Sequence, residues 1–278
     1  MTGIDPITNG GVMKSKKTLL ATVGGLALLS GSAQAALIGA FDFDTASGWL
    51  ADGTAVTYDS GANANLNCAA GALPGANGCG LTFSGLQEIT DGHTTVNWFS
   101  NGGQGPSGLD IQSNSGTLVT NGGWFDTGVI THRNFSLPSP ATTLRNLNLG
   151  SEFSITSPFA FGPAVGAFNI GFTETPNQGG CPAPNPLGSA CDDFFSISGI
   201  PLPIVVEIDG IVYTFTFRLQ GGEGFIVDDN TLYTREGGQN TLFVQAMVTA
   251  REVQVPEPAT LGILGLGLLL LNRRKFIK

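Results

Sequence analysis

The chain has 278 residues, a formal charge of −9, 41 glycines and 15 prolines, and only 12% of its residues are charged. Between residues 36 and 255 there are five arginines, no lysine and 19 acidic residues, so the formal charge of this part is −14. A negatively charged surface makes nucleic acid and anionic membranes poor partners. Cations, basic proteins and neutral glycans are the remaining classes of partner. The glycine and proline content, without a repeat or a strand–helix alternation, predicts short strands joined by many turns.

The N-terminal segment predicts a secretory signal peptide over residues 13–35. A basic stretch with three lysines leads into the apolar run 19–29 and then into small residues that end on Ala33-Gln34-Ala35. This order of regions places signal cleavage between Ala35 and Ala36. Residues 1–12 precede a complete signal, so we expect a mis-called start or an extended basic region there and exclude them from the fold prediction.

Residues 37–44 alternate apolar and polar side chains, which predicts a first strand with Asp42 and Asp44 on its solvent face. Two acids two residues apart can also bind calcium. No third or fourth oxygen ligand is evident nearby, so a solvated strand face is the favoured interpretation.

The four cysteines form two local pairs, Cys68 with Cys79 and Cys181 with Cys191. Four cysteines allow three pairings. We favour the two local bridges, because each closes a short loop rich in Gly, Pro and Asn and because an exported chain folds in an oxidising compartment. Zinc is the alternative, but the residues between the paired cysteines are too many for the usual spacing of zinc ligands.

Apolar stretches predict further strands at residues 93–99, 164–172, 204–208, 211–219 and 241–249. Asp209-Gly210 is a typical hairpin turn, because both residues tolerate the positive φ angles of a type I′ turn. Alternation after this turn predicts an apolar face made of Ile211, Tyr213, Phe215, Phe217 and Leu219. The predicted fold is one all-β domain over residues 36–255, an antiparallel two-sheet sandwich with a barrel or jelly roll as the alternative.

The chain has two histidines, His93 and His132. Neither Gly-x-Ser-x-Gly nor His-Glu-x-x-His occurs, so no common hydrolase or zinc-protease motif is present. We expect His132 to secure the end of a strand by hydrogen bonds with Thr131 and Asn134. A ligand or metal contact is the less favoured alternative.

A glycosidase needs two carboxylates that face each other across a cleft. The sequence offers candidates but does not indicate which converge: Glu88, Glu174, Glu207 and Asp209. Two loop stretches, Asp192-Asp193 and Asp228-Asp229-Asn230, are predicted to be solvated turns, with calcium binding as the alternative.

The three tryptophans, Trp49, Trp98 and Trp124, could form a platform on which sugar rings stack. Tryptophan in a β-sandwich is more often a core residue, and we expect that role here. The sugar-binding alternative depends on the destination that the C-terminal segment indicates.

The C-terminal segment has three parts: Pro256-Glu257-Pro258, an uncharged apolar run at 259–271, and a basic end with Arg273, Arg274 and Lys275. A helix over the apolar run would be about 20 Å long, shorter than a bilayer core of about 30 Å. The terminal position and the basic residues that follow at once nevertheless favour a membrane segment over a buried helix. Basic residues at both ends of the chain place those ends on the cytoplasmic side, so the part between them is exported.

This segment, residues 256–278, resembles the PEP-CTERM sorting signal of Gram-negative bacteria. The resemblance implies handling by an exosortase of the inner membrane, which cleaves near the tripeptide. It also implies delivery to the cell surface or to an extracellular polysaccharide matrix. It covers this segment alone.

Residues 90–195 resemble a family of PEP-CTERM proteins named for a Thr-His-x-Asn signature, here Thr131-His132-Arg133-Asn134. Further features fit the family: His93 shortly before Trp98, and the stretches 108–111, 172–177 and 191–194. Members often carry more cysteines in the last third, and this chain has none there. The family has no assigned biochemical role, so the resemblance implies kinship and destination but no reaction.

These patterns predict an exported, exosortase-processed protein of the cell surface, extracellular matrix or biofilm, structural or adhesive and associated with polysaccharide. A secreted hydrolase that acts on such a polymer is the alternative. We expect no catalytic residue and no cofactor apart from the calcium alternatives above. Signal peptidase and exosortase are the expected partners during export, with a transient contact of the tail with the inner membrane.

Overall fold

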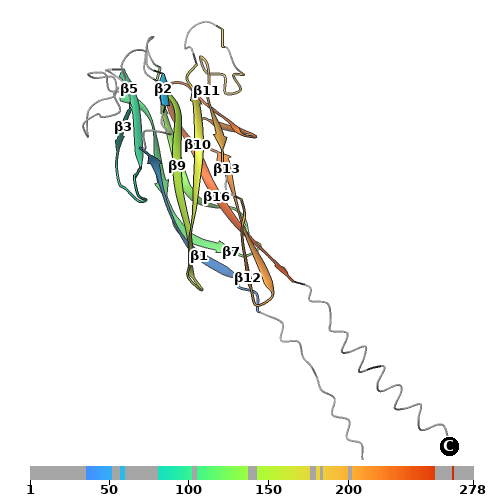
Figure 1. Ribbon diagram of the computed structural model, residues 1–278. Helices are drawn as coiled ribbons and strands as arrows, with labels where there is room; N and C mark the ends of the chain where they lie inside the picture. The colour runs from blue at the N-terminus through green and yellow to red at the C-terminus, as the bar shows by residue number, and fades with distance from the viewer. Residues whose placement is uncertain are drawn as a thin grey trace, which may run out of the picture. The chain divides into compact units, whose positions relative to one another are not determined.

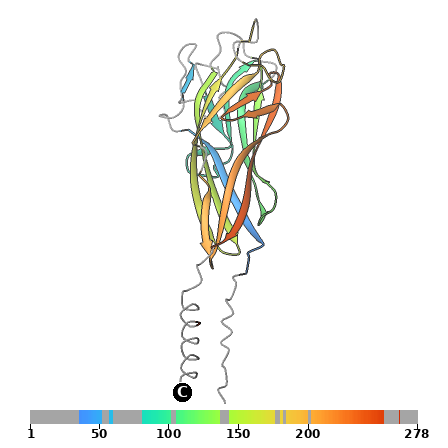
Figure 2. The same cartoon turned by 90° about the vertical axis from the view of Figure 1, so that its right-hand side faces the viewer.

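The computed structural model describes residues 36–51, 57–59, 81–101, 105–136, 143–175, 180–181, 184–199 and 202–253, and Gly265. Strands β1 to β16 form two antiparallel sheets in this part of the chain (Figures 1 and 2). Apart from Gly265 no described residue is helical, and no described helix is long and apolar enough to cross a bilayer. The predicted all-β fold of two sheets is confirmed. The predicted leader and, except for Gly265, the predicted membrane segment lie outside the described residues.

The first sheet is organised around the long strands β9 and β10. Its central path is β14 (Phe225–Asp228), β15 (Thr231–Thr234), β11 (Asp193–Ser198), β10 (Phe161–Thr173), β9 (Thr143–Ser157), β1 (Ala40–Leu50) and β4 (Gly92–His93). Two short strands join from the side, β2 (Thr57–Asp59) against β9 and β7 (Ser115–Val119) against β1.

The second sheet contains the hairpin predicted around Asp209-Gly210 and the strand that carries Thr131-His132-Arg133-Asn134. Its order is β12 (Ile204–Ile208), β13 (Ile211–Gly221), β16 (Gly238–Glu252), β8 (Phe125–Asn134), β6 (Gly105–Ser113), β5 (Thr95–Asn101) and β3 (Leu81–Ser84). The colours in Figures 1 and 2 show β13 and β16 running along most of the β domain.

The two sheets pack through their apolar faces. One group of buried side chains includes Trp49, Leu147 and Ile170 from the first sheet and Trp98, Leu109 and Leu242 from the second. Another includes Phe41 and Phe43 from the first sheet and Tyr213, Phe215 and Val248 from the second. An apolar cavity of about 320 Å³ is lined by both sheets, and none of the described residues that line it is acidic. Burial of apolar surface therefore holds the sheets together.

The local strand predictions agree with the structure where the pattern was clear. In β1, Phe41 and Phe43 are buried while Asp42 and Asp44 are exposed, as the alternation predicts. The β12–β13 hairpin pairs Ile208 with Ile211, and the turn between them has positive φ at both positions, 50° and 79°.

The predicted strand at residues 93–99 is wrong in one respect, because the chain changes sheets there. His93 ends β4 in the first sheet, and Thr95 begins β5 in the second. Thr94 between them donates its N–H to the carbonyl of Leu86 at 3.2 Å, outside either ladder. The apolar pattern continues through this crossover and does not reveal it.

Candidate functional site

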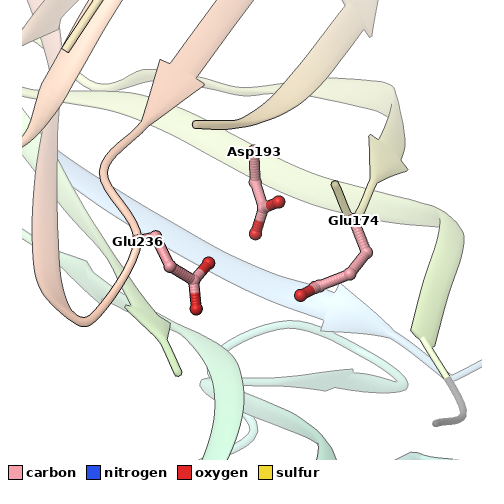
Figure 3. A group of neighbouring side chains, drawn as sticks. All are labelled: Glu174, Asp193 and Glu236. Atoms are coloured by element: carbon pink, nitrogen blue, oxygen red, sulfur yellow. The ribbon is translucent and has the colours of Figure 1, made fainter. Parts of the chain in front are cut away.

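Three acidic side chains meet at one end of the β domain. Glu174 directly follows β10, Asp193 begins β11, and Glu236 lies in the connection between β15 and β16. Each contributes a carboxylate oxygen that lies within 4.8 Å of the other two. Figure 3 shows the three carboxylates turned toward one common space. Because β11 pairs with β10 on one side and with β15 on the other, sheet pairing brings this acid cluster together.

Several oxygens of the acid cluster are buried without a hydrogen-bond partner. Both oxygens of Glu174 and Oδ2 of Asp193 make no hydrogen bond with a described residue, while the carboxylate of Glu236 has the side chain of Ser136 as a partner. Oδ1 of Asp193 accepts from the main-chain N–H of Thr175 at 2.7 Å and from its hydroxyl at 3.0 Å. An unsatisfied buried polar group costs about 1–3 kcal/mol, and more when it is charged. Three such atoms, both oxygens of Glu174 and Oδ2 of Asp193, lie in one space and therefore require a physical explanation.

Burial shifts the acid cluster toward its protonated forms. Burial first, and then the charges of Asp193 and Glu236, raises the pKa of Glu174 to about 10. Burial raises the pKa of Asp193 to about 7, against the opposing hydrogen bond from the Thr175 N–H. Burial also raises the pKa of Glu236. Without a cation, the cluster therefore holds protons at neutral pH.

His132 lies beside this cluster and is fully buried. Its ring centroid is 5.7 Å from that of Trp98, 5.6 Å from that of Phe172 and 4.9 Å from that of Phe195. Burial, and secondarily the charge of Arg133, lowers the pKa of His132 to about 3. The imidazole is therefore neutral at physiological pH.

The hydrogen bond of His132 differs from the one that the sequence predicts. Nδ1 lies 3.1 Å from the hydroxyl oxygen of Thr234 on β15, and Nε2 has no partner among the described residues. The hydroxyl of Thr234 donates to the main-chain oxygen of Asp193 at 3.5 Å. The prediction that His132 bonds to Thr131 and Asn134 is therefore wrong, because the ring points across the core to the other sheet.

Asn134, the last residue of β8, fixes the connection that carries Glu236. Its side-chain N–H donates to the main-chain oxygen of Arg235 at 3.2 Å, and Asn240 donates to the same oxygen at 2.9 Å. The N–H of Gly237 donates to the main-chain oxygen of Asn134 at 3.0 Å. Asn134 is 0% exposed, and its Oδ1 has no partner in the described part of the chain. His132 thus contacts Thr234, which is hydrogen-bonded to Asp193 of the cluster. Asn134 holds the main chain at Arg235, next to Glu236 of the cluster.

Arg133, the variable position of the motif, joins neighbouring strands of the second sheet. Its Nε donates to Oδ2 of Asp110 at 2.7 Å. Its other guanidinium nitrogens donate to Oδ1 of Asn97 at 2.6 Å and to the carbonyl of Pro106 at 3.0 Å. The guanidinium therefore connects β8 with β6 and β5.

The sequence segments that resemble the Thr-His-x-Asn family gather in this region. Trp98 stacks on His132, and Asp110 from the stretch 108–111 pairs with Arg133. Phe172 and Glu174 belong to the stretch 172–177, and Asp193 belongs to 191–194. Segments far apart in the chain thus form one structural unit.

Asp192 and Asp193 are not the solvated turn that the sequence predicts, because their side chains are 1% and 0% exposed. Asp192 organises its own loop: Oδ2 accepts from the N–H of Leu187 at 2.6 Å, and Oδ1 accepts from the hydroxyl of Ser189 at 2.6 Å. The second predicted turn is confirmed, since Asp228 ends β14, residues 229–230 connect it to β15, and all three are exposed.

The other candidate acids lie apart from the cluster. Glu88 accepts hydrogen bonds from the N–H of Ser47 and from the hydroxyl of Ser113. Glu207 is exposed on β12, and Asp209 occupies the β12–β13 turn. Figure 1 shows β12 near the end of the domain opposite the β11 label. Of the four carboxylates considered for a glycosidase, Glu174 alone belongs to the cluster.

The tryptophans do not form a shared sugar platform. Trp49 and Trp98 are 0% exposed, which confirms their core role. Trp124 is half-buried, and the guanidinium carbon of Arg218 lies 4.3 Å from its ring centroid. The predicted bridge between Cys181 and Cys191 is present, while Cys68 and Cys79 lie outside the described residues.

Glu236 is the member of the cluster that the sequence did not predict. It follows Arg235 in a short connection, and no local pattern distinguishes it from the other surface acids. For Asp193 the sequence predicts only a turn shared with Asp192. β10, β11 and β15 are far apart in the sequence, so local patterns do not predict that they are neighbours in the sheet.

Comparison with known families identifies the C-terminal segment. Residues 254–275 match the model of the PEP-CTERM protein-sorting motif. The chain carries a PEP-CTERM sorting signal. This PEP-CTERM signal includes the predicted Pro256-Glu257-Pro258 tripeptide and marks the chain as an exosortase-targeted, exported protein of the cell surface. A comparison with curated proteins found no significant match.

Proposed function

We propose that the β domain is a structural or adhesive component of the cell surface or extracellular matrix that associates with extracellular polysaccharide after exosortase removes the tail. The observation that carries this proposal is the sorting motif at residues 254–275. In this scheme signal peptidase cuts between Ala35 and Ala36, and the apolar tail holds the chain in the inner membrane until exosortase cleavage.

Two properties of the β domain support an extracellular destination. The Cys181–Cys191 bridge suits an oxidising compartment. The acidic surface between residues 36 and 255 also opposes binding to nucleic acid and anionic lipid. The contacts of Trp98 and Phe172 with His132, and of Asp110 with Arg133, support membership of the Thr-His-x-Asn group of PEP-CTERM proteins.

A hydrolase that acts on the same polymer is the second proposal. Glu174 and Asp193 favour it, because one has a pKa of about 10 and the other of about 7 in a shared space. The buried oxygens of the cluster favour the structural role instead, since a glycosidase must admit a sugar between its carboxylates.

Incubation of the full-length protein with extracellular polysaccharide from the producing cells tests both proposals. Co-sedimentation measures association, and the appearance of new reducing ends measures turnover. Association without turnover, unchanged in Glu174→Ala and Glu207→Ala, is the result that the structural proposal expects. Turnover that Glu174→Ala abolishes while association remains would establish the hydrolase instead, and an absence of association would contradict the adhesive role.

A further inference from the structure

The buried acid cluster has the composition of a site for a hard divalent cation. Its three side chains offer only oxygen atoms, which Ca²⁺ and Mg²⁺ prefer, and no sulfur or imidazole ligand that would favour zinc. Two oxygens on opposite sides of an ion bound at about 2.4 Å are about 4.8 Å apart. Oxygens of Glu174, Asp193 and Glu236 that all lie within 4.8 Å of one another are therefore near enough to converge on one calcium ion after small side-chain movements.

Unsatisfied buried atoms indicate a ligand independently of the acid count. The side chain of Asp193 is 0% exposed, and its Oδ2 has no hydrogen-bond partner among the described residues. Figure 3 shows the Asp193 carboxylate directed into the common space. Asn134, whose side chain lowers the pKa of Asp193 by a hydrogen bond, is also 0% exposed, and its Oδ1 has no described partner. Acids on a protein surface are solvated, whereas Oδ2 of Asp193 and Oδ1 of Asn134 are buried.

The surrounding hydrogen bonds fix the cluster before any ion binds. Thr175 orients Asp193 through Oδ1, which leaves Oδ2 free. Asn134 and Asn240 hold the main chain at Arg235, and the N–H of Glu236 donates to the hydroxyl of Ser189 at 3.3 Å. A preorganised set of oxygens loses little conformational entropy on binding an ion.

We propose that Glu174, Asp193 and Glu236 bind one Ca²⁺, which joins β10, β11 and the β15–β16 connection. The ion neutralises two of the three carboxylate charges and provides a partner for the buried oxygens of Glu174 and for Oδ2 of Asp193. Calcium suits the cluster better than Mg²⁺, because Mg²⁺ requires near-ideal octahedral geometry at about 2.0–2.1 Å and gives up its water reluctantly. This site stabilises the β domain whether or not the proposed polysaccharide association holds.

Calcium titration of the full-length protein tests the site. The protein, purified in mild detergent and freed of metal with a chelator, is titrated with CaCl₂ by calorimetry, and its melting temperature is followed in parallel. We expect one bound ion and, at a calcium concentration about 100 times the Kd, a rise in melting temperature of about 5–10 °C. Mg²⁺ at the same concentration should produce a smaller rise.

Glu236→Gln and Glu174→Gln remove one charged ligand each. Glu236 lies in a connection between strands, so its replacement leaves the sheets intact. Each variant should weaken calcium binding about tenfold or more and lose most of the thermal shift. Glu207→Gln, at an exposed acid on β12, is the matched control and should keep the wild-type response. Wild-type protein that binds no calcium, or Gln variants that respond like the wild type, would overturn the proposal.

Discussion

Nδ1 of His132 lies 3.1 Å from the hydroxyl oxygen of Thr234, and this contact joins the two sheets through the core. His132 belongs to β8 of the second sheet, and Thr234 ends β15 of the first. Both residues are 0% exposed. Since the Thr234 hydroxyl also donates to the main chain of Asp193, the histidine of the motif is coupled to the acid cluster through one hydroxyl group.

Thr234→Val should destabilise the protein, because it keeps the side-chain shape but leaves Nδ1 of His132 buried without a partner. The expected loss is about 1–3 kcal/mol in the free energy of unfolding. Urea denaturation measures it. Thr234→Ser keeps the hydroxyl and is the control, and an equal loss in both variants would show that packing of the methyl group matters rather than the hydrogen bond.

His132 should make stability fall in mild acid. Its pKa is about 3 in the folded protein, against an ordinary value of about 6.5 in the unfolded chain. Between these values the unfolded chain binds a proton that the folded protein does not, so stability is lost as pH falls below about 6.5. The slope approaches about 1.4 kcal/mol per pH unit.

Comparison with His132→Phe isolates this contribution, because phenylalanine fits an aromatic environment and does not titrate. Urea denaturation of both proteins from pH 7.5 to pH 5, at constant calcium, should show the wild type losing stability relative to the variant. Parallel pH profiles of the two proteins would mean that His132 has the same pKa in the folded and unfolded states, which would contradict the prediction.

Arg133→Lys should destabilise the second sheet. Lysine cannot reproduce the three directed contacts of the guanidinium with Asp110, Asn97 and Pro106. The expected loss is about 1–2 kcal/mol in chemical denaturation. Arg251→Lys changes an exposed arginine and should stay within about 0.5 kcal/mol of the wild type. An equally small effect at Arg133 would contradict the structural role of its contacts.

Removal of the Cys181–Cys191 bridge should lower stability by about 3 kcal/mol, as the chain-entropy model gives for a short loop. The double variant Cys181→Ser/Cys191→Ser is preferable to reduction, because a reductant also acts on Cys68 and Cys79. Thermal and urea unfolding under oxidising conditions measure the change. No change would mean that the hydrogen bonds of Asp192 alone secure this loop.

Local patterns predicted the strands, whereas the acid cluster depends on pairing between distant strands. Alternation in β1 and the Asp209-Gly210 turn involve neighbouring residues. The two-residue period of a strand and the residue preferences of a turn were therefore enough to predict them. Glu236 approaches Glu174 only because β11 lies between β10 and β15, an order that no local pattern encodes. The motif predicted the importance of His132 but not its partner, since Thr234 belongs to the other sheet.

The sorting account is tested most directly by the intact mass and the location of the protein in its native envelope. Wild-type protein is compared with a Pro256→Ala/Pro258→Ala variant. The account predicts a wild-type product that begins at Ala36, lacks the tail and lies outside the cell, and a variant that stays in the inner membrane. Retention of residues 259–278 in the membrane by both proteins would contradict it and would make the tail a plain anchor.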